Sequence, residues 1–402
     1  MKERDAGRMD PPGERSKSMP ARAVSPALPG TGTTEQQPPA PPPPSLCLVA
    51  NMAANLYRTD YTGGVGGVEV QYKLLARQMA RQHPTAILFV APPPGTTLVA
   101  EPGVRLVPYE PGSGSLWSFL RGLWRGAKSA RSDIYMQSAA GVATFALALF
   151  CRLRGRPFVF HWASDADLDG ALIPDVGYDR RLFRLGRRMA TAQVCQTQRQ
   201  WEMLRPRERR RAIILPNLLD TAVPWPTADG SEVLWVATIK DTAKRPERFL
   251  DLAAALPRRR FRMVGELKGD PAFQAEFRRR LAQLPNVDWV GFVPREGMPR
   301  HYKAARVLVN TSDTEGFPNT FLEAAASGVP VVSLNVDPNG ILAKDGAGRC
   351  LAGDAAALPA AVESFYDDAT WRKARAACRR VAERHAPEAI ARDLGLFLAS
   401  LR

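Results

Sequence analysis

The feature that most constrains the fold of this 402-residue chain is an alternation, from Ser45 onward, between short apolar runs and longer amphipathic stretches. The short runs are typical of buried strands, and the longer stretches have the periodicity of helices lying on a core. Strands that alternate with helices form a parallel sheet with helices on both faces, so an α/β fold is expected. The expected strands of the first half are 46–52, 86–91, 104–109, 133–137, 157–163, 192–197 and 212–217, with a helix at 68–82.

A dense group of Pro and Gly residues, PNLLDTAVPWPTADG at 216–230, interrupts this alternation. A dense group of residues that break helices and strands predicts a linker between domains. The alternation then restarts, with expected strands at 233–238, 261–266, 287–293, 306–312 and 329–334 and expected helices at 246–256, 321–328 and 387–402. The sequence therefore predicts two Rossmann-like domains, 45–220 and 221–386, with parallel sheets that face each other across a cleft.

The first 44 residues differ in composition from the rest of the chain. They contain 11 prolines, end in PPAPPPP and offer almost nothing apolar to bury. Such a segment cannot offset the entropy lost on folding, and its proline run favours polyproline II. We expect residues 1–44 to be a disordered tail.

The overall composition, 45% hydrophobic and 24% charged, excludes collagen, a coiled coil and wholesale disorder. Five scattered cysteines without a C-x-x-C pair and four histidines without metal-ligand spacing argue against a disulfide framework, a zinc finger and a His-rich metal enzyme. The longest apolar run, 139–151, has 13 residues, too few for a bilayer, and no signal peptide is apparent. We expect a cytoplasmic protein, soluble or peripheral, because this cysteine usage fits a reducing compartment.

The net charge of +15 is concentrated in residues 121–211, which hold 18 Lys and Arg against 8 Asp and Glu. Such a field attracts polyanions, although a solvated basic surface explains it equally well. At the start of this region an apolar set lies beside Arg121 and Arg125, namely Trp117, Leu120, Leu123 and Trp124. We expect this set to hold the protein peripherally on an anionic membrane, the inner face of the plasma membrane, and we expect no specific nucleic-acid partner.

A glycine-rich loop, TGGVGGVEVQ at 62–71, joins the first expected strand to the first expected helix. Its glycines, Gly66 and Gly67 among them, allow a ligand close to the backbone at a helix N-terminus, where free N–H groups favour an anion. The loop lacks the spacing and the following acid of a dinucleotide fingerprint. A phosphate or sugar contact is therefore favoured over NAD.

A second motif, EGFPNTFLEAAASGVPVVS at 315–333, lies between two expected strands. A short helix from Thr320, ended by Gly328, would leave Glu315 in the loop before it and project Glu323 from its side. Both carboxylates could reach one ligand. The phosphates of that ligand would lie on the backbone amides of Phe317, Asn319 and Thr320, with Pro318 between them.

This motif resembles that of the retaining nucleotide-sugar glycosyltransferases of family 4, which have the GT-B fold. The family hallmark, E-x7-E followed by A-x-x-x-G-x-P-V-V, is matched by Glu315, Glu323, Ala324, Gly328, Pro330, Val331 and Val332. The resemblance implies that Glu323 binds the nucleotide ribose and that Glu315 binds hydroxyls of the transferred sugar. It places the nucleobase near Val290–Val293, which include Gly291. It also implies that helix 387–402 returns to the first domain.

Family members hold the diphosphate with an Arg and a Lys after the first strand of the second domain. The corresponding stretch here is VATIKDTAKRPE, in which Lys244 matches the family lysine. Thr238 stands at the usual Arg position, so Lys240 is expected to substitute for it. A lysine there makes physical sense because the leaving diphosphate gains negative charge.

The segment FVFHWASDADLD at 158–169 has Ser164-Asp165 where many relatives carry a His-Asp pair. The resemblance makes Asp165 a cleft residue that binds sugar hydroxyls. The D-x-D-x-D run could instead hold a divalent cation, as in GT-A transferases. We favour the first alternative and expect no metal, because the GT-B relatives act without one.

The sequence thus predicts a metal-independent, retaining glycosyltransferase of the hexosyltransferase type, with Glu315, Asp165 and Lys244 in catalysis. It would move a sugar from a nucleoside-diphosphate sugar, its donor substrate, to a glycan, lipid-linked or small-molecule acceptor, as in polysaccharide biosynthesis, with no cofactor. A GT-B nucleotide-sugar epimerase or phosphorylase shares the fold but lacks support from further motifs. A non-catalytic polyanion-binding protein would instead show salt-dependent binding to DNA.

Overall fold

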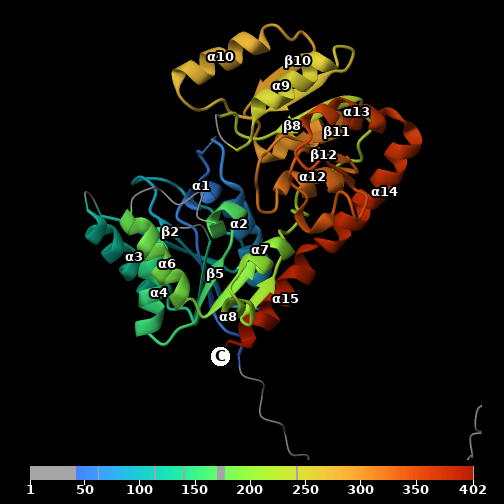
Figure 1. The fold of residues 1–402 in the computed structure, drawn as a ribbon. Helices are drawn as coiled ribbons and strands as arrows, with labels where there is room; N and C mark the ends of the chain where they lie inside the picture. Colours follow the sequence, from blue (N-terminus) through green and yellow to red (C-terminus); the bar gives the residue numbers. More distant parts are fainter. Residues whose placement is uncertain are drawn as a thin grey trace, which may run out of the picture. The chain divides into compact units, whose positions relative to one another are not determined.

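The computed structural model describes residues 42–61, 63–112, 115–138, 141–169, 177–240 and 243–401, and residues 43–402 form one compact unit (Figure 1). Most of the predicted tail, up to residue 41, lies outside the described residues. Within the described part of the chain no helix is long and apolar enough to cross a membrane.

The first half of the unit is a seven-stranded sheet in the order β3-β2-β1-β4-β5-β6-β7, with every pair of neighbours parallel. Its strands are β1 (Leu46–Val49), β2 (Thr85–Val90), β3 (Val104–Tyr109), β4 (Ile134–Ser138), β5 (Phe158–His161), β6 (Ala192–Cys195) and β7 (Ala212–Ile214). Four of the strands are buried along their whole length, as expected of a parallel sheet covered on both faces. All seven predicted strands of this half are confirmed, with ends that move by a few residues.

Helices cover both faces of this sheet. They are α1 (Ala54–Tyr57), α2 (Gly67–Met79), α3 (Leu116–Ala130), α4 (Val142–Leu153), α5 (Asp165–Asp169), α6 (Gly177–Met189), α7 (Gln198–Met203) and α8 (Pro206–Arg209). One core contains α2, and the other contains α3, α4 and α6. The three helices of the second core lie side by side on the outside of the sheet (Figure 1).

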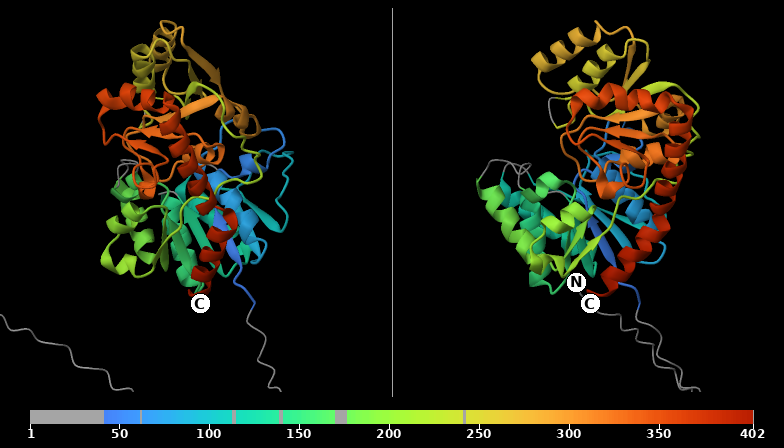
Figure 2. Two further views of the ribbon diagram at one scale, coloured as in Figure 1. Left: turned by 90° about the vertical axis from the view of Figure 1, so that its right-hand side faces the viewer. Right: turned by 45° about the vertical axis from the view of Figure 1, so that its right-hand side comes forward.

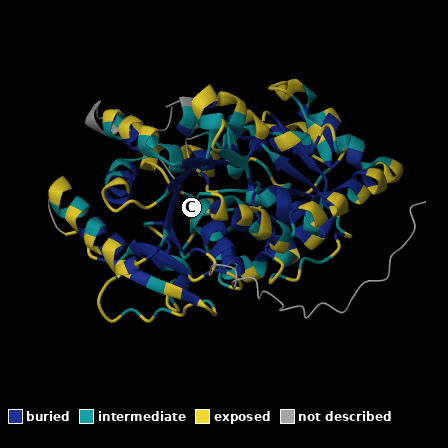
Figure 3. Cartoon of the chain, turned by 90° about the horizontal axis from the view of Figure 1, so that it is seen from below, coloured by how far each residue is buried: buried dark blue, intermediate teal, exposed yellow. Residues whose placement is uncertain are grey.

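The second half is a six-stranded parallel sheet in the order β10-β9-β8-β11-β12-β13. Its strands are β8 (Glu232–Val236), β9 (Phe261–Val264), β10 (Val287–Gly291), β11 (Ala305–Asn310), β12 (Val331–Ser333) and β13 (Gly348–Cys350). Strand β13 was not predicted, because its three residues at the sheet edge form no apolar run. Two cores again lie on the two faces of the sheet, and Figure 3 shows buried residues gathered in strands and on the inner sides of helices.

The helices of the second half begin with α9 (Pro246–Ala255), α10 (Pro271–Leu281) and α11 (Met298–Ala304), the last preceded by the 3-10 turn η1 (Arg295–Gly297). They continue with α12 (Asn319–Ser327), η2 (Pro338–Gly340), η3 (Ala355–Ala357), α13 (Leu358–Glu363), η4 (Ser364–Tyr366), α14 (Asp368–Arg384) and α15 (Pro387–Ala399). Helix α12 ends at Gly328, whose φ of 70° suits glycine in the position that stops a helix.

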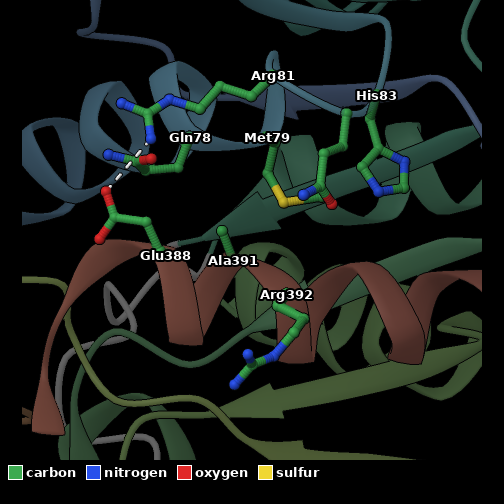
Figure 4. Close-up of a pocket in the computed structure, with 8 residues that line it drawn as sticks. Gln78, Met79, Arg81, His83, Glu388, Ala391 and Arg392 are labelled. Atoms are coloured by element: carbon green, nitrogen blue, oxygen red, sulfur yellow. Dashed lines mark hydrogen bonds and ion pairs between the residues drawn. The ribbon is translucent and has the colours of Figure 1, made fainter.

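Helix α15 packs on the first domain, as predicted. Its apolar residues Ile390, Leu394 and Leu398 are buried in the core that contains β1 and α2. Helices α14 and α15 connect the second sheet to the first (Figure 2). A cavity of about 80 Å³ marks the seam between α2 and α15, where Arg81 pairs with Glu388 at 3.2 Å (Figure 4).

Candidate active site

The carboxyl ends of the strands of both sheets meet in a layer of side-chain amides. Gln196 follows β6, Asn217 follows β7, Gln71 lies on α2 and Asn319 begins α12. Asn319 Oδ1 accepts hydrogen bonds from Gln71 Nε2 at 3.0 Å and from Asn217 Nδ2 at 2.9 Å. Gln196 Nε2 donates to Asn217 Oδ1 at 3.0 Å. These amides join the first domain to the start of α12, inside the E-x7-E motif.

The backbone of the motif also touches the first domain. The amide of Phe317 donates to Gln196 Oε1 at 3.0 Å, and its carbonyl accepts from Asn217 Nδ2 at 2.7 Å. A Cβ at Gly316 would lie 2.3 Å from the carbonyl oxygen of Ala163, so only glycine allows this approach. The expected phosphate contact of the Phe317 amide therefore differs from the structure, in which a side chain of the first domain takes that N–H.

The other expected phosphate amides are those of Asn319 and Thr320. Both residues lie in the first turn of α12, where amides have no carbonyl partner within the helix. Pro318 is buried directly before the helix, and Phe321 N–H closes the turn on its carbonyl at 3.1 Å. These two amides are the part of the motif that can still receive an anion.

Glu315 lies in the loop after β11 and is held by three donors. Lys244 Nζ lies 2.6 Å from Oε2, and Ser312 Oγ and Asn310 Nδ2 donate to Oε1 at 2.7 Å and 2.9 Å. Burial alone would raise the pKa of this carboxyl, but the Lys244 ammonium and the hydrogen bonds outweigh it and hold the pKa below its ordinary value. Glu315 is therefore an ionised, oriented carboxylate.

Lys244 lies in the turn before α9, and two hydrogen bonds join this turn to the loop that carries Glu315. The Lys244 carbonyl accepts from Thr311 Oγ1 at 2.8 Å, and Asp313 N–H donates to the carbonyl of Ala243 at 2.7 Å. The Lys244 side chain is still one-third exposed. Lys240 is exposed just after the β-bridge at Ile239, four residues earlier in the chain.

Glu323, in the second turn of α12, is buried and holds two partners. Arg295 Nη1 donates to Oε1 at 3.0 Å, and Tyr302 Oη donates to Oε2 at 2.8 Å. Burial and the neighbouring carboxylate raise the pKa of Tyr302 well above its ordinary value, so it remains a donor. Arg295 and Tyr302 were not predicted, because no motif marks them.

The glycine loop reaches the same place from the first domain, although its Thr62 lies outside the described residues. Gly66 caps α2 and Gly67 begins it. The carbonyl of Gly67 accepts from Asn319 Nδ2 at 3.2 Å, and a Cβ at Gly67 would also lie 3.2 Å from that nitrogen. Glycine here permits close approach of α2 to α12.

Asp165 lies in the first turn of α5, a short helix that the sequence did not predict. It pairs with Arg199 of α7 at 3.1 Å, and Asp167 accepts the Ser164 N–H at 3.2 Å. Because Ala163 contacts Gly316, the segment that carries Asp165 lies against the E-x7-E motif. Among the described residues no group of three or more His, Cys, Asp or Glu side chains is arranged to hold a metal ion.

Gly291 ends β10 with a φ of 80°, and its carbonyl accepts the Gly265 N–H at 2.8 Å. The chain then turns toward Arg295, which brings the expected nucleobase segment next to Glu323. The site residues predicted in the second domain thus lie in the loops after β8 and β11, at the end of β10 and on α12, and the three strands end at one edge of the parallel sheet.

Comparison with known proteins gives this geometry a context. Residues 230–368 match the family described as Glycosyl transferases group 1. An O-antigen chain mannosyltransferase B from Escherichia coli is 36% identical over 87 residues, which are 22% of this chain and 23% of that relative. The match thus spans about a quarter of the length of this curated relative.

Solved structures resemble the chain over most of its length. Sucrose-phosphate synthase from Thermosynechococcus elongatus has a TM-score of 0.70 at 18% identity, covering 89% of this chain and 99% of that one. HepE from Anabaena, in complex with UDP-glucose, has a TM-score of 0.69 at 16% identity, covering 89% and 100%. The expected GT-B fold is confirmed by these structures, and the match to the glycosyl transferases group 1 family is limited to residues 230–368.

Proposed function

We propose that this protein is a retaining glycosyltransferase of family 4 that moves a hexose from a nucleoside-diphosphate sugar to a hydroxyl acceptor. The observation that carries the proposal is the oriented pair Lys244–Glu315 beside the α12 N-terminus, with Glu323 in the second turn of that helix. All three side chains fall inside the matched glycosyltransferase region, 230–368.

In this proposal the diphosphate lies between the amides of Asn319 and Thr320 and the ammonium of Lys244. The phosphate gains negative charge as its bond to the sugar breaks, and a positioned ammonium stabilises that charge most in the transition state. Lys244 supplies a positive charge that a divalent cation would otherwise provide, so we propose a metal-independent reaction. Lys240, exposed nearby, adds a second cation on the approach of the donor.

Glu315 then faces the transferred sugar. As an ionised carboxylate it accepts hydrogen bonds from sugar hydroxyls and stabilises the positive charge that develops at the anomeric carbon. We propose that the acceptor oxygen attacks the face from which the phosphate departs. The anomeric carbon exchanges its phosphate oxygen for the acceptor oxygen, and the leaving phosphate takes the acceptor proton. Asp165, on the segment against Gly316, would bind sugar or acceptor hydroxyls from the first domain.

The acceptor is proposed to be a glycan or a lipid-linked glycan met at an anionic membrane surface on the cytoplasmic side. Trp117 on α3 is 80% exposed, Leu153 at the end of α4 is 66% exposed and Leu185 on α6 is 45% exposed. The same three helices and their ends carry exposed basic residues, namely Arg121, Arg125, Lys128, Arg152, Arg154, Arg181, Arg184 and Arg188. We call these eleven residues the basic face. It differs from the expected set, because Leu123 is buried and Leu120 and Trp124 pack against the core.

The test is binding of candidate donors. HepE is described in complex with UDP-glucose and the curated relative is a mannosyltransferase, so the panel holds UDP, GDP and ADP with their glucose and mannose derivatives. At 100 times its Kd the correct donor raises the free energy of unfolding by about 2.7 kcal/mol. Lys244→Ala should weaken diphosphate binding, whereas Lys303→Ala, on the exposed side of α11, should not. A parent protein stabilised by none of these ligands would overturn the proposed function.

A further inference from the structure

A continuous chain of side chains leads from the first domain to Glu323. Arg77 Nη2 donates to Asp220 Oδ1 at 3.0 Å, and Arg295 Nε donates to Asp220 Oδ2 at 3.0 Å. Arg295 Nη1 then donates to Glu323 Oε1, and Tyr302 closes the chain on Oε2. Arg295 is the member that joins the linker to the carboxylate on α12.

Asp220 is a rigid anchor for this arginine. It lies in the linker between the two sheets, its side chain is 9% exposed, and its Oδ1 also accepts the Ala222 N–H at 3.1 Å. Its carbonyl accepts from the indole of Trp225 at 2.9 Å. Burial alone would raise the pKa of Asp220, but Arg295 and Arg77 outweigh burial and lower it. Asp220 is therefore a buried, ionised carboxylate whose partners hold it in a fixed position.

The guanidinium of Arg295 has N–H donors beyond those that bind Asp220 and Glu323. The guanidinium carries five N–H groups, and it uses Nε for Asp220 and Nη1 for Glu323. Among the described residues Nη2 donates no hydrogen bond, and the side chain is 26% exposed. In the part of the chain that the structure describes, each oxygen of Glu323 accepts one side-chain hydrogen bond, from Arg295 or from Tyr302, and keeps further lone pairs. A vicinal diol can therefore donate to Glu323 and accept from Arg295 at the same time.

We propose that Arg295 is a positioning residue of the nucleotide site, which holds Glu323 against Asp220 so that this carboxylate receives the 2′ and 3′ hydroxyls of the donor ribose. The inference rests on the proposed function. This role requires the planar guanidinium group of an arginine, because a lysine ammonium cannot bridge two carboxylates with the same fixed geometry. Without the Arg295 guanidinium, Glu323 stays buried with Tyr302 as its remaining partner. Its carboxylate can then turn away from the diol.

The first experiment compares Arg295→Gln with the parent by calorimetric titration of UDP, GDP and ADP and of their 2′-deoxy forms. We expect the preferred ribonucleotide to bind the variant about tenfold more weakly or worse, as for loss of a charge-assisted hydrogen bond. We also expect the ratio of the 2′-deoxynucleotide Kd to the ribonucleotide Kd, which exceeds one in the parent, to fall toward one in the variant. A merely structural arginine would lower the melting temperature and leave that ratio unchanged.

The matched control is Arg262→Gln. Arg262, on β9, also bridges two carboxylates, Glu232 and Asp288, and its side chain is 25% exposed. These three residues lie at the amino ends of β8, β9 and β10, the edge of the sheet opposite the proposed site. Arg262→Gln should keep the nucleotide affinity and the ribo-to-deoxy ratio of the parent.

A second variant tests the anchor. Asp220→Asn should weaken nucleotide binding in the same direction, and its effect should be less than additive with that of Arg295→Gln because both act through one contact. If Arg295→Gln does not fold, Arg295→Lys is titrated in its place, with weaker binding again expected. Unchanged affinity and an unchanged ratio in the folded Arg295 variant would overturn this inference alone. Failure of the parent to bind any of the nucleotides would overturn the proposed function and this inference with it.

Discussion

Lys244 has two tasks in the proposed reaction. It lowers the pKa of Glu315, and it is the cation proposed to contact the donor diphosphate. The two tasks compete, because one ammonium on a partly exposed side chain serves both anions. A donor that draws Lys244 toward its phosphates therefore leaves Glu315 more basic and better able to accept sugar hydroxyls.

This competition predicts the behaviour of Glu315→Gln. Binding of the bare nucleoside diphosphate should be retained or tighter, because the neutral amide no longer holds Lys244. Single-turnover transfer should fall by about 100-fold or more, since an oriented charge at the anomeric carbon is lost. Calorimetric titration beside rapid-quench kinetics measures both. Sugar transfer at the parental rate would contradict the role given to Glu315.

His161 predicts a pH dependence of stability. It ends β5, its ring stacks on Tyr72 with centroids 5.8 Å apart, and neither ring nitrogen has a partner among the described residues. Burial lowers the pKa of His161 from 6.5 to about 4. The unfolded chain therefore binds more protons between these values, so the free energy of unfolding falls as the pH drops from about 6.5 to 4.

Replacing this histidine should flatten that dependence. His161→Phe keeps the stacked ring and removes the titration, which in the parent lowers the free energy of unfolding by at most about 3 kcal/mol at pH 4 relative to neutral pH. Urea unfolding at a series of pH values between 4 and 7 measures it, with some slope remaining from His301 and His385, whose pKa values are also lowered by burial. An equally steep slope in His161→Phe would show that this histidine is not the group responsible.

At the scale of the elements, α15 has one face in the first core and one in solvent. Leu394 is fully buried there, whereas Leu396, two positions later, is 68% exposed. Leu394→Ala should lower the free energy of unfolding by about 2–5 kcal/mol through lost contacts and a cavity. Leu396→Ala should change it by less than about 0.5 kcal/mol. Equal effects of the two changes on chemical unfolding would contradict the docking of α15.

The basic face, whose residues lie on or next to helices α3, α4 and α6, gives a second prediction at this scale. Combined replacement of Arg121, Arg125 and Lys128 by Gln should weaken binding to anionic vesicles by about 3 kcal/mol, roughly 1 kcal/mol for each charge. The control replaces Arg278, Arg279 and Arg280 of α10, which changes the net charge equally. Co-sedimentation with anionic and neutral vesicles at low and high salt measures the difference. Salt-sensitive binding to DNA with no preference for anionic vesicles would contradict the membrane assignment.

At the scale of the whole molecule, the proposed reaction depends on the close contact between the two domains at Gly316. A methyl group there would collide with the Ala163 carbonyl and with Gln196 Oε1, 2.4 Å away. Gly316→Ala should therefore reduce turnover more than nucleotide affinity, because the nucleotide contacts that we propose lie in the second domain. Gly141→Ala is the control, since a Cβ at Gly141 meets nothing within 4 Å. Comparison of kcat with nucleotide Kd checks this, and parental turnover in Gly316→Ala would contradict it.

The elements of the fold could be predicted because their signals are local. The apolar run 104–109 became β3 without a change of bounds, and the E-x7-E segment became a loop and helix α12 ended at Gly328. Short or polar elements were not predicted, among them β13 and α5, whose DADLD sequence carries no apolar period. The boundaries predicted for the domains, 45–220 and 221–386, stay predictions.

The sequence by itself determined the two parallel sheets and the presence of Glu315, Lys244 and Glu323, because strand burial and motif spacing are written in neighbouring residues. Only the tertiary structure decided what these side chains touch. Lys244 meets Glu315 across 71 positions, Arg295 meets Asp220 across 75, and Gln196 meets the Phe317 amide across 121. A buried charge or amide takes whichever partner the packing of distant loops brings within 3 Å, and no local pattern encodes that choice.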